Sequence, residues 1–213
     1  RYFKKAPIVF WVLDLWPDTL MAVGAFRSKL ILKLVGWLVS YIYKRCDLIL
    51  GQSKSFISHI RKYAGHDRVA YFPGWAESVF SVDQFKSPNS RSEKAQFNVV
   101  FAGNVGVSQD FPTVLKAMEH LKENKNICWT IVGDGRIFDW LAAEIVNLGL
   151  ENVVRLPGRY LMEDMPKFFQ DADALLVNLK DDPIFSMTIP GKLQAYLVTG
   201  KPILALLNGE GAH

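Results

Sequence analysis

The sequence has few of the residues that build covalent cross-links or metal centres. It contains only two cysteines, Cys46 and Cys128, which stand far apart inside apolar segments and lack metal-type spacing. No secretory pattern accompanies them, so they favour a reduced cytoplasmic setting over a disulfide framework. The four histidines show no pairwise spacing that would bring two of them together on one helix face: His59, His66, His120 and His213. We therefore predict neither a metal centre nor a cofactor.

Long apolar runs are also lacking, although 50% of the residues are hydrophobic. The stretch from Leu34 to Tyr43 covers about ten residues, half of the roughly twenty that a membrane-spanning helix needs. The sequence has no initiator Met, opens almost directly on an apolar run at 8–13, and stops just after another one that ends near Leu206. We interpret it as an internal fragment of a longer protein.

Acidic residues are scarce in the first part of the chain. Residues 1–80 carry about +7, while the remainder carries about −3. A basic first part suggests an anionic partner, such as a phospholipid surface, a phosphate-bearing substrate or nucleic acid, but a merely solvated basic face explains it equally well. Nucleic acid is the least favoured partner, because the nearby aromatic residues Trp37, Tyr41 and Tyr43 follow a helical stripe and not a strand surface.

Residues 1–80 read as the C-terminal part of one α/β domain. A strand at 8–13 ends in a loop that carries Asp14 and Trp16, and in parallel sheets this edge is where ligands bind. An amphipathic helix with a basic rim is predicted at 28–45, followed by a strand at 48–50, a helix at 53–63 and a strand at 69–72. Residues 81–96 are polar and aperiodic, which is typical of a linker.

Residues 97–213 alternate regularly between strands and helices. Strands are predicted at 98–102, 128–132, 153–156, 174–178 and 202–206, with helices at 111–122, 138–148, 163–170 and 192–199. This alternation predicts βαβ units with right-handed crossovers around a parallel sheet. The fold class is therefore α/β, with a second, Rossmann-like domain that is incomplete at its end.

Glycine-rich turns follow the first two strands of this domain. Such turns approach an anion closely, although a tight turn needs glycine for its geometry alone. The three-glycine dinucleotide fingerprint is absent, which argues against a nicotinamide-dependent dehydrogenase. The candidate residues are Gly103, Asn104, Gly106 and Gln109 in the first turn and Gly133, Asp134 and Gly135 in the second.

Two later turns complete the set of candidate residues. Gly158, Arg159 and Tyr160 offer backbone polar groups and an aromatic face suited to a nucleobase. Lys192 stands in the first turn of a helix, where acids are usual, so it goes against the local electrostatics and favours a ligand role. The same segment supplies further candidates: Ser186, Thr188, Pro190 and Gln194.

The ordered combination of these motifs resembles glycosyltransferase family 4, whose members have the GT-B fold of two Rossmann-like domains. The resemblance is closest to enzymes of bacterial surface-polysaccharide and O-antigen assembly, including N-acetylfucosamine transferases. It implies a first domain truncated at its N-terminus and a second truncated at its C-terminus. It rests on FAGNVG with Gln109-Asp110, IVGDG, VRLPGRY, IPGKLQAYLVTGKPI, Asp14-Leu15-Trp16-Pro17 and Gln52-Ser53.

The resemblance implies where each part of a nucleotide-diphosphate sugar would bind. The turn at 103–109 and Lys192 would contact the diphosphate, 158–160 the base, and 186–194 the sugar and ribose. Asp14 and Trp16 would lie on the acceptor side, and Asp14 is a weak candidate for a catalytic role. No metal or cofactor is implied. Asn104 and Gln109 stand where many members have Arg and Lys, while Met187 and Ala195 replace a pair of glutamates.

The predicted activity is transfer of a hexosyl or N-acetylhexosaminyl group to a saccharide acceptor, such as one linked to polyprenyl diphosphate. We expect the protein in the cytoplasm, peripheral to an anionic membrane. Two alternatives stay open, a GT-B epimerase that rearranges a sugar nucleotide and a non-catalytic nucleotide-binding or interaction module. The segment 186–194 offers no acid or base for epimerisation, and the lost glutamates favour the module. We expect residues 1–213 alone to be inactive.

Overall fold

The computed structural model describes residues 6–26, 28–85 and 96–213, and its contacts divide the chain into two units. Unit 1 comprises Arg1–Gly74, Asp181–Ile189 and Asn208–His213, and unit 2 comprises Trp75–Lys180 and Pro190–Leu207. Most of the predicted linker, 81–96, lies outside the described residues. The domain boundaries proposed from sequence stay a prediction, and each unit is described by itself.

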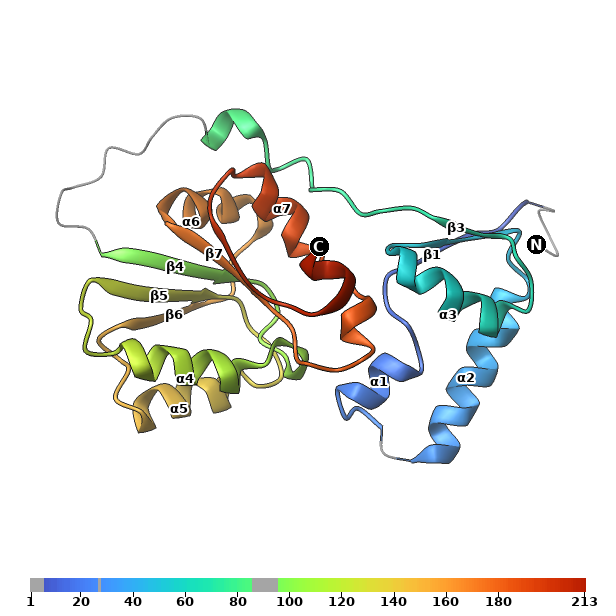
Figure 1. The fold of residues 1–213 in the computed structure, drawn as a ribbon, viewed down its shortest axis with the longest axis horizontal. Coiled ribbons are helices and arrows are strands. Elements are labelled where there is room, and N and C mark those ends of the chain that lie inside the picture. Colours follow the sequence, from blue (N-terminus) through green and yellow to red (C-terminus); the bar gives the residue numbers. More distant parts are fainter. Residues whose placement is uncertain (1–5, 27, 86–95) are drawn as a thin grey trace. The chain divides into compact units, whose positions relative to one another are not determined.

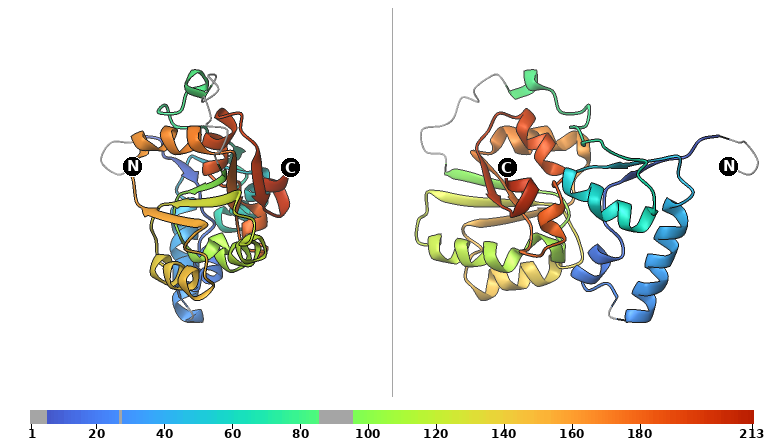
Figure 2. Two further views of the ribbon diagram at one scale, coloured as in Figure 1. Left: turned by 90° about the vertical axis from the view of Figure 1, so that its left-hand side faces the viewer. Right: turned by 45° about the vertical axis from the view of Figure 1, so that its right-hand side comes forward.

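Unit 2 is built on a five-stranded parallel sheet in the order β6-β5-β4-β7-β8. The strands are β4 (Phe97–Ala102), β5 (Ile127–Val132), β6 (Val154–Gly158), β7 (Ala174–Asn178) and β8 (Ile203–Leu206). The helices are α4 (Phe111–Leu121), α5 (Phe138–Asn147), α6 (Met165–Asp171) and α7 (Lys192–Val198). Figures 1 and 2 show α4 and α5 on one face of the sheet and α6 and α7 on the other. The predicted α/β class is confirmed.

Alternation along the strands supplies a core to each face of this sheet. On β4, Phe101 belongs to the cluster that packs α4 and α5, whereas Val100 belongs to the cluster with Phe169 and Tyr196. Since successive side chains of a strand point to opposite faces, a continuously apolar strand is what a sheet covered on both sides requires. The burial of the apolar runs in β4, β5 and β7 follows from this arrangement.

The sheet opens between β4 and β7, where the strand order reverses. β4 pairs with β5 along its whole length but with β7 only at Val99 and Val100. Beyond that point a side chain bonds the backbone of β4. The Tyr196 hydroxyl accepts from the Ala102 N–H at 2.9 Å and donates to the Ala102 carbonyl at 3.3 Å. Such a reversal leaves a crevice at the carboxyl ends of the strands, where ligands of α/β proteins bind.

Unit 1 contains a three-stranded parallel sheet, β1 (Val9–Val12), β2 (Leu48–Gly51) and β3 (Val69–Tyr71), in that order. Its helices are α1 (Asp18–Ala22), α2 (Lys29–Tyr43) and α3 (Lys54–Ala64). The start of α3 is capped twice, because Ser53 Oγ accepts from Phe56 N–H and the Glu210 carboxylate accepts from the N–H groups of Lys54 and Ser55, both at 2.7 Å. These bonds satisfy amides that a helix leaves free at its N-terminus.

The strands and the longer helices predicted from periodicity are confirmed to within a few residues. β6 runs on to Gly158 through Pro157, although the prediction ended it at Leu156. A proline is tolerated there because β6 is the edge strand of its sheet. The short helix α1 was not predicted. Among the described residues, no helix combines the length and apolar character needed to cross a bilayer.

Removing the Tyr196 hydroxyl should weaken unit 2. A Tyr196→Phe variant keeps the ring but leaves the Ala102 N–H buried without a partner, and we expect the free energy of unfolding to fall by about 1–3 kcal/mol. Urea denaturation followed by circular dichroism measures this change. The matched control is Tyr160→Phe, since Tyr160 is 45% exposed. Removing its hydroxyl should change the free energy of unfolding by no more than about 0.5 kcal/mol. Equal stability of the two variants would contradict the assignment.

Candidate functional site

Two neighbouring cavities lie at the carboxyl ends of the strands of unit 2. The turn cavity is lined by Gly103, Asn104, Val132, Gly133, Asp134, Gly135, Arg159, Tyr160, Met162 and Met165. The lysine cavity is lined by Glu77, Phe80, Ala102, Gly103, Met162, Met165, Phe169, Gly191, Lys192, Ala195 and Tyr196. They share Gly103, Met162 and Met165, so the two cavities adjoin. Residues from the first, second, third and fourth predicted turns thus come together.

The glycines of the first two turns are required by contact between the turns themselves. A side chain at Gly133, which has φ +139°, would place its Cβ within 1.9 Å of the Gly103 carbonyl oxygen. One at Gly135 would meet the Val105 carbonyl at 2.5 Å. Gly103 has φ +137°, and a Cβ there would lie 3.1 Å from Lys192 Nζ. Geometry therefore accounts for the second turn, whereas Gly103 also leaves space beside a cation.

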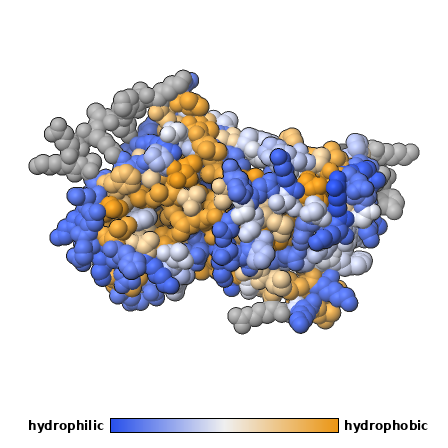
Figure 3. All heavy atoms as spheres, viewed as in Figure 1, coloured by the Kyte–Doolittle hydropathy of each residue, from blue (hydrophilic) through white to orange (hydrophobic). Residues whose placement is uncertain are grey.

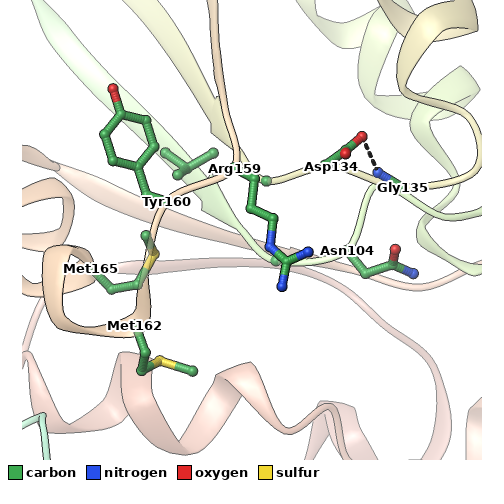
Figure 4. A pocket seen from close by; sticks show the side chains of 10 residues that line it. Asn104, Asp134, Gly135, Arg159, Tyr160, Met162 and Met165 are labelled. Carbon is green, nitrogen blue, oxygen red and sulfur yellow. Dashed lines mark hydrogen bonds between the residues drawn. The ribbon is translucent and has the colours of Figure 1, made fainter.

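Arg159 brings a guanidinium group into the turn cavity. In Figure 4 its side chain extends toward Asn104, while the Tyr160 ring points away from it and Met162 lies opposite. The Asp134 carboxylate bonds within its own turn, because its Oδ1 accepts from the Gly135 N–H at 2.6 Å. The Tyr160 ring packs edge-on against Phe168 at 4.8 Å between centroids. The cavity thus offers one cation, Arg159, and apolar side chains from two methionines.

Lys192 holds its ammonium group against an aromatic ring at the start of α7. Nζ lies 3.5 Å from the centroid of the Phe101 ring and donates to Gln109 Oε1 at 3.3 Å. Part of the Lys192 chain stays exposed, but burial of the charged end lowers its pKa from 10.5 to about 7. An aromatic face and an amide oxygen stabilise the cation only in part. A bound anion would supply the charge that the surroundings lack.

Asn178, which sequence reasoning missed, fixes the first turn in front of Lys192. It is fully buried at the end of β7 and its Nδ2 donates to the Gln109 carbonyl. The Lys180 N–H donates to the Ser108 carbonyl at 2.8 Å, so the end of β7 holds this turn at two points. Asp110 follows with φ 43°, an uncommon conformation for a residue other than glycine. A polar residue ending an apolar strand was the available signal.

The other residues predicted to bind the nucleotide-sugar donor do not line either of the two cavities. Gly158 ends β6 with φ +83° and no atom crowds its open side, while Gly106 faces the Asn104 side chain. The Gln194 amide nitrogen donates to the carbonyls of Pro190 and Gly191 at the start of α7. Ser186 and Thr188 belong to unit 1, where their hydroxyls donate to the carbonyls of Asp182 and Ile184.

The candidate acceptor-side residues lie in unit 1 after β1. Trp16 is 49% exposed, and partial burial raises the pKa of the Asp14 carboxyl. The same loop leads into α1, where Asp18 Oδ2 lies 2.9 Å from His59 Nε2. Burial lowers the pKa of His59, and the charge of Asp18 opposes that shift. Sequence reasoning missed this pair because its members are far apart in the chain. In the described part, no group of three His, Cys, Asp or Glu is arranged to hold a metal.

Solved structures of glycosyltransferases share this architecture. HepE of Anabaena in complex with UDP-glucose matches 97% of this chain and 54% of its own, with 18% identity and a TM-score of 0.71. The lipopolysaccharide glycosyltransferase WaaG matches 98% and 59%, at 17% identity and a TM-score of 0.68. TarM of S. aureus matches 97% and 42%, at 13% identity and a TM-score of 0.63. The chain therefore has part of the GT-B fold, spanning about half the length of these proteins.

One family model matches part of the sequence. Residues 82–187 match the family model described as "Glycosyl transferases group 1", and this stretch contains the strands and turns that build the turn cavity. This stretch is thus similar to the group 1 glycosyltransferases, also known as family 4. No curated protein sequence matches the chain.

The buried lysine should make the stability of unit 2 depend on pH. Because the pKa of Lys192 is about 7 in the folded state, against 10.5 for an ordinary lysine, the unfolded chain binds more protons between these values. Stability should therefore rise with pH across this window. We expect Lys192→Met to stabilise the protein by roughly 1–3 kcal/mol at pH 6, and by much less at pH 10.5.

Urea titrations at the two pH values measure this difference. Lys116→Met is the matched control, since it removes an exposed lysine from α4 and should change stability little at either pH. An unchanged or lower stability of Lys192→Met at pH 6 would show that the ammonium group is well solvated in the folded protein.

Proposed function

We propose that the protein is a glycosyltransferase that uses a nucleotide-diphosphate sugar as its donor. The observation that carries this proposal is the ammonium group of Lys192, which is enclosed beside Gly103 at the point where β4 and β7 part. HepE, a relative in fold, was solved with UDP and with UDP-glucose. A buried cation among apolar residues is costly unless an anion binds there, and a diphosphate supplies that anion.

In this proposal each part of the donor has its own place. The diphosphate lies against Lys192 and the turn at 103–109, and the base lies in the turn cavity beside Arg159 and Tyr160. Catalysis then rests on positioning the sugar and stabilising the departing diphosphate while an acceptor hydroxyl attacks the anomeric carbon. Fixed cations and backbone amides provide this stabilisation, so we propose that no metal is needed. Asp14 and Trp16 would face the acceptor.

The acceptor and pathway are inferred from the sequence resemblance. We propose a lipid-diphosphate-linked saccharide as acceptor and a role in surface-polysaccharide assembly, with a hexose or N-acetylhexosamine such as N-acetylfucosamine as the transferred sugar. An epimerase is the less favoured alternative, because the lysine cavity contains a single carboxylate, Glu77, and no histidine among its lining residues. A non-catalytic nucleotide-binding module would use the same cavities without an acceptor.

Donor binding should be accompanied by uptake of a proton. Near pH 8 the side chain of Lys192 is mostly an uncharged amine in the free protein, since its pKa is about 7. A bound diphosphate raises that pKa. We expect uptake of nearly one proton, and an affinity that falls as pH rises above about 7. Calorimetry with UDP-, GDP- and dTDP-sugars, each in two buffers of different ionisation enthalpy, measures both quantities.

Two variants make this experiment specific. Lys192→Met should lower the affinity at least about tenfold and abolish proton uptake, whereas Lys116→Met should change neither. Binding of no nucleotide sugar by the wild type would overturn the proposal. Assays of transfer, hydrolysis and epimerisation with the same donors and the full-length protein would then separate the transferase from its two alternatives.

We also propose that α2 contacts an anionic membrane. Its apolar stripe is exposed to solvent in the described structure, with Leu30 68%, Leu34 59% and Trp37 65% exposed. Trp37 stacks on Tyr41 at 5.6 Å between centroids, and the Arg45 guanidinium lies 3.4 Å from the centre of the Tyr41 ring. The polar rim adds further lysines at 29, 33 and 44. Aromatic and basic residues beside an apolar stripe suit the lipid interface. Figure 3 shows hydrophobic residues reaching the surface among hydrophilic ones.

Sedimentation with vesicles of phosphatidylglycerol and phosphatidylcholine tests this surface. We expect the protein in the pellet at low salt, and release as salt screens the basic residues. Replacing Trp37 and Leu34 together by serine should lower the bound fraction several-fold, because apolar burial supplies part of the affinity. Lys116→Glu, on α4, is the charge control and should bind normally. Equal recovery in the supernatant with and without vesicles would exclude membrane contact.

A further inference from the structure

The lysine cavity contains a second charged group whose role neither the family match nor the donor proposal assigns. Among its lining residues, Lys192 is the cation and Glu77 is the carboxylate, while the walls are formed mainly by aromatic and methionine side chains. Helix α7 contributes Ala195, which has no hydrogen-bonding side chain. The Tyr196 hydroxyl is engaged by the backbone of Ala102. Glu77 is therefore the side-chain acceptor that this cavity offers to a ligand.

The backbone that carries Glu77 is tied to the floor of the cavity. The Phe80 N–H donates to the Glu77 carbonyl at 3.0 Å, and the buried Phe80 ring stacks on Phe169 at 5.3 Å between centroids. The short helix that follows, at Val82–Phe85, is held as well, because Gln170 Nε2 donates to the Gln84 carbonyl at 3.0 Å. An exposed glutamate is thus presented from a fixed backbone and not from a free linker.

The chemistry of the two charges determines which part of a donor each can bind. An ionised carboxylate is an acceptor only, with two oxygens that suit a pair of neighbouring hydroxyl groups. It repels a diphosphate, which must lie toward Lys192. We propose that Glu77 is a specificity-determining residue, whose carboxylate accepts hydrogen bonds from vicinal hydroxyls of the bound nucleotide sugar. This inference rests on the proposed donor function, and the hydroxyls belong to either the ribose or the transferred sugar.

The sign of the effect separates hydrogen bonding from simple charge. If Glu77 only repelled the diphosphate, Glu77→Ala would tighten binding. If it accepts from hydroxyls, removal weakens binding by about tenfold, the effect of losing a hydrogen bond to a charged group at a partly exposed site. Glu77→Gln keeps the shape and one acceptor oxygen, and should fall between the wild type and Glu77→Ala. Because Glu77 is exposed, both variants should unfold at the temperature of the wild type, which a melting curve checks.

Calorimetry with UDP, 2′-deoxy-UDP and UDP-glucose locates the hydroxyls. If they belong to the ribose, Glu77→Ala weakens UDP about tenfold and leaves 2′-deoxy-UDP nearly unchanged. If they belong to the sugar, it leaves UDP unchanged and weakens UDP-glucose about tenfold. Glu163→Ala is the matched control, since Glu163 follows Met162 but does not line the cavity. Tighter or unaltered binding of all three ligands by Glu77→Ala overturns this inference alone. A wild type that binds no nucleotide, in a panel extended to GDP and dTDP, overturns both this inference and the donor function.

Discussion

A lysine ammonium group held against the face of a phenylalanine is the interaction on which the candidate site of unit 2 depends. Lys192 Nζ lies 3.5 Å from the Phe101 ring centroid, and burial brings its pKa to about 7. The space it occupies exists because β4 stops pairing with β7 after Val100, and because Gly103 carries no side chain. Neither neighbour neutralises the charge of the protonated lysine, which a bound diphosphate would stabilise.

The supports of this lysine come from three separate parts of unit 2. Gln109 accepts from Nζ, Asn178 at the end of β7 holds the Gln109 carbonyl, and Tyr196 closes the backbone of β4 behind the cavity. Asn178 is not among the residues that line either cavity, so we regard it as a positioning residue. Because Gln109 is neutral, it does not repel the Lys192 ammonium group as a second cation would.

The sequence predicted the fold well, because each strand and helix of unit 2 has its own apolar period and is bounded by glycine turns. The predicted parallel sheet also implied that the turn residues lie close together, because the carboxyl ends of parallel strands meet at one edge. It did not single out Asn178, although a polar residue at the end of an apolar strand is a signal, and it could not predict Glu77, whose importance depends on neighbours far away in the chain. For the same reason it could not show that Gly133 is required by contact with Gly103. The bond from Gln194 to the start of its own helix is local, but the residue pattern does not show which way that side chain turns.

The charges of the site also explain how an acidic part of the chain could bind an anion. Residues 81–213 carry about −3, so their overall field opposes a nucleotide diphosphate, and local groups must supply the attraction. In the lysine cavity the cation and the carboxylate come from residues that are far apart in the sequence. Lys192 lies in α7, and Glu77 lies in the segment before β4. Two opposite charges in one apolar cavity favour a ligand with an anionic part and a hydroxyl-bearing part in a single orientation. A sugar nucleotide has both, so a cavity that bound one as we propose would select its ligand by polarity and not by net charge.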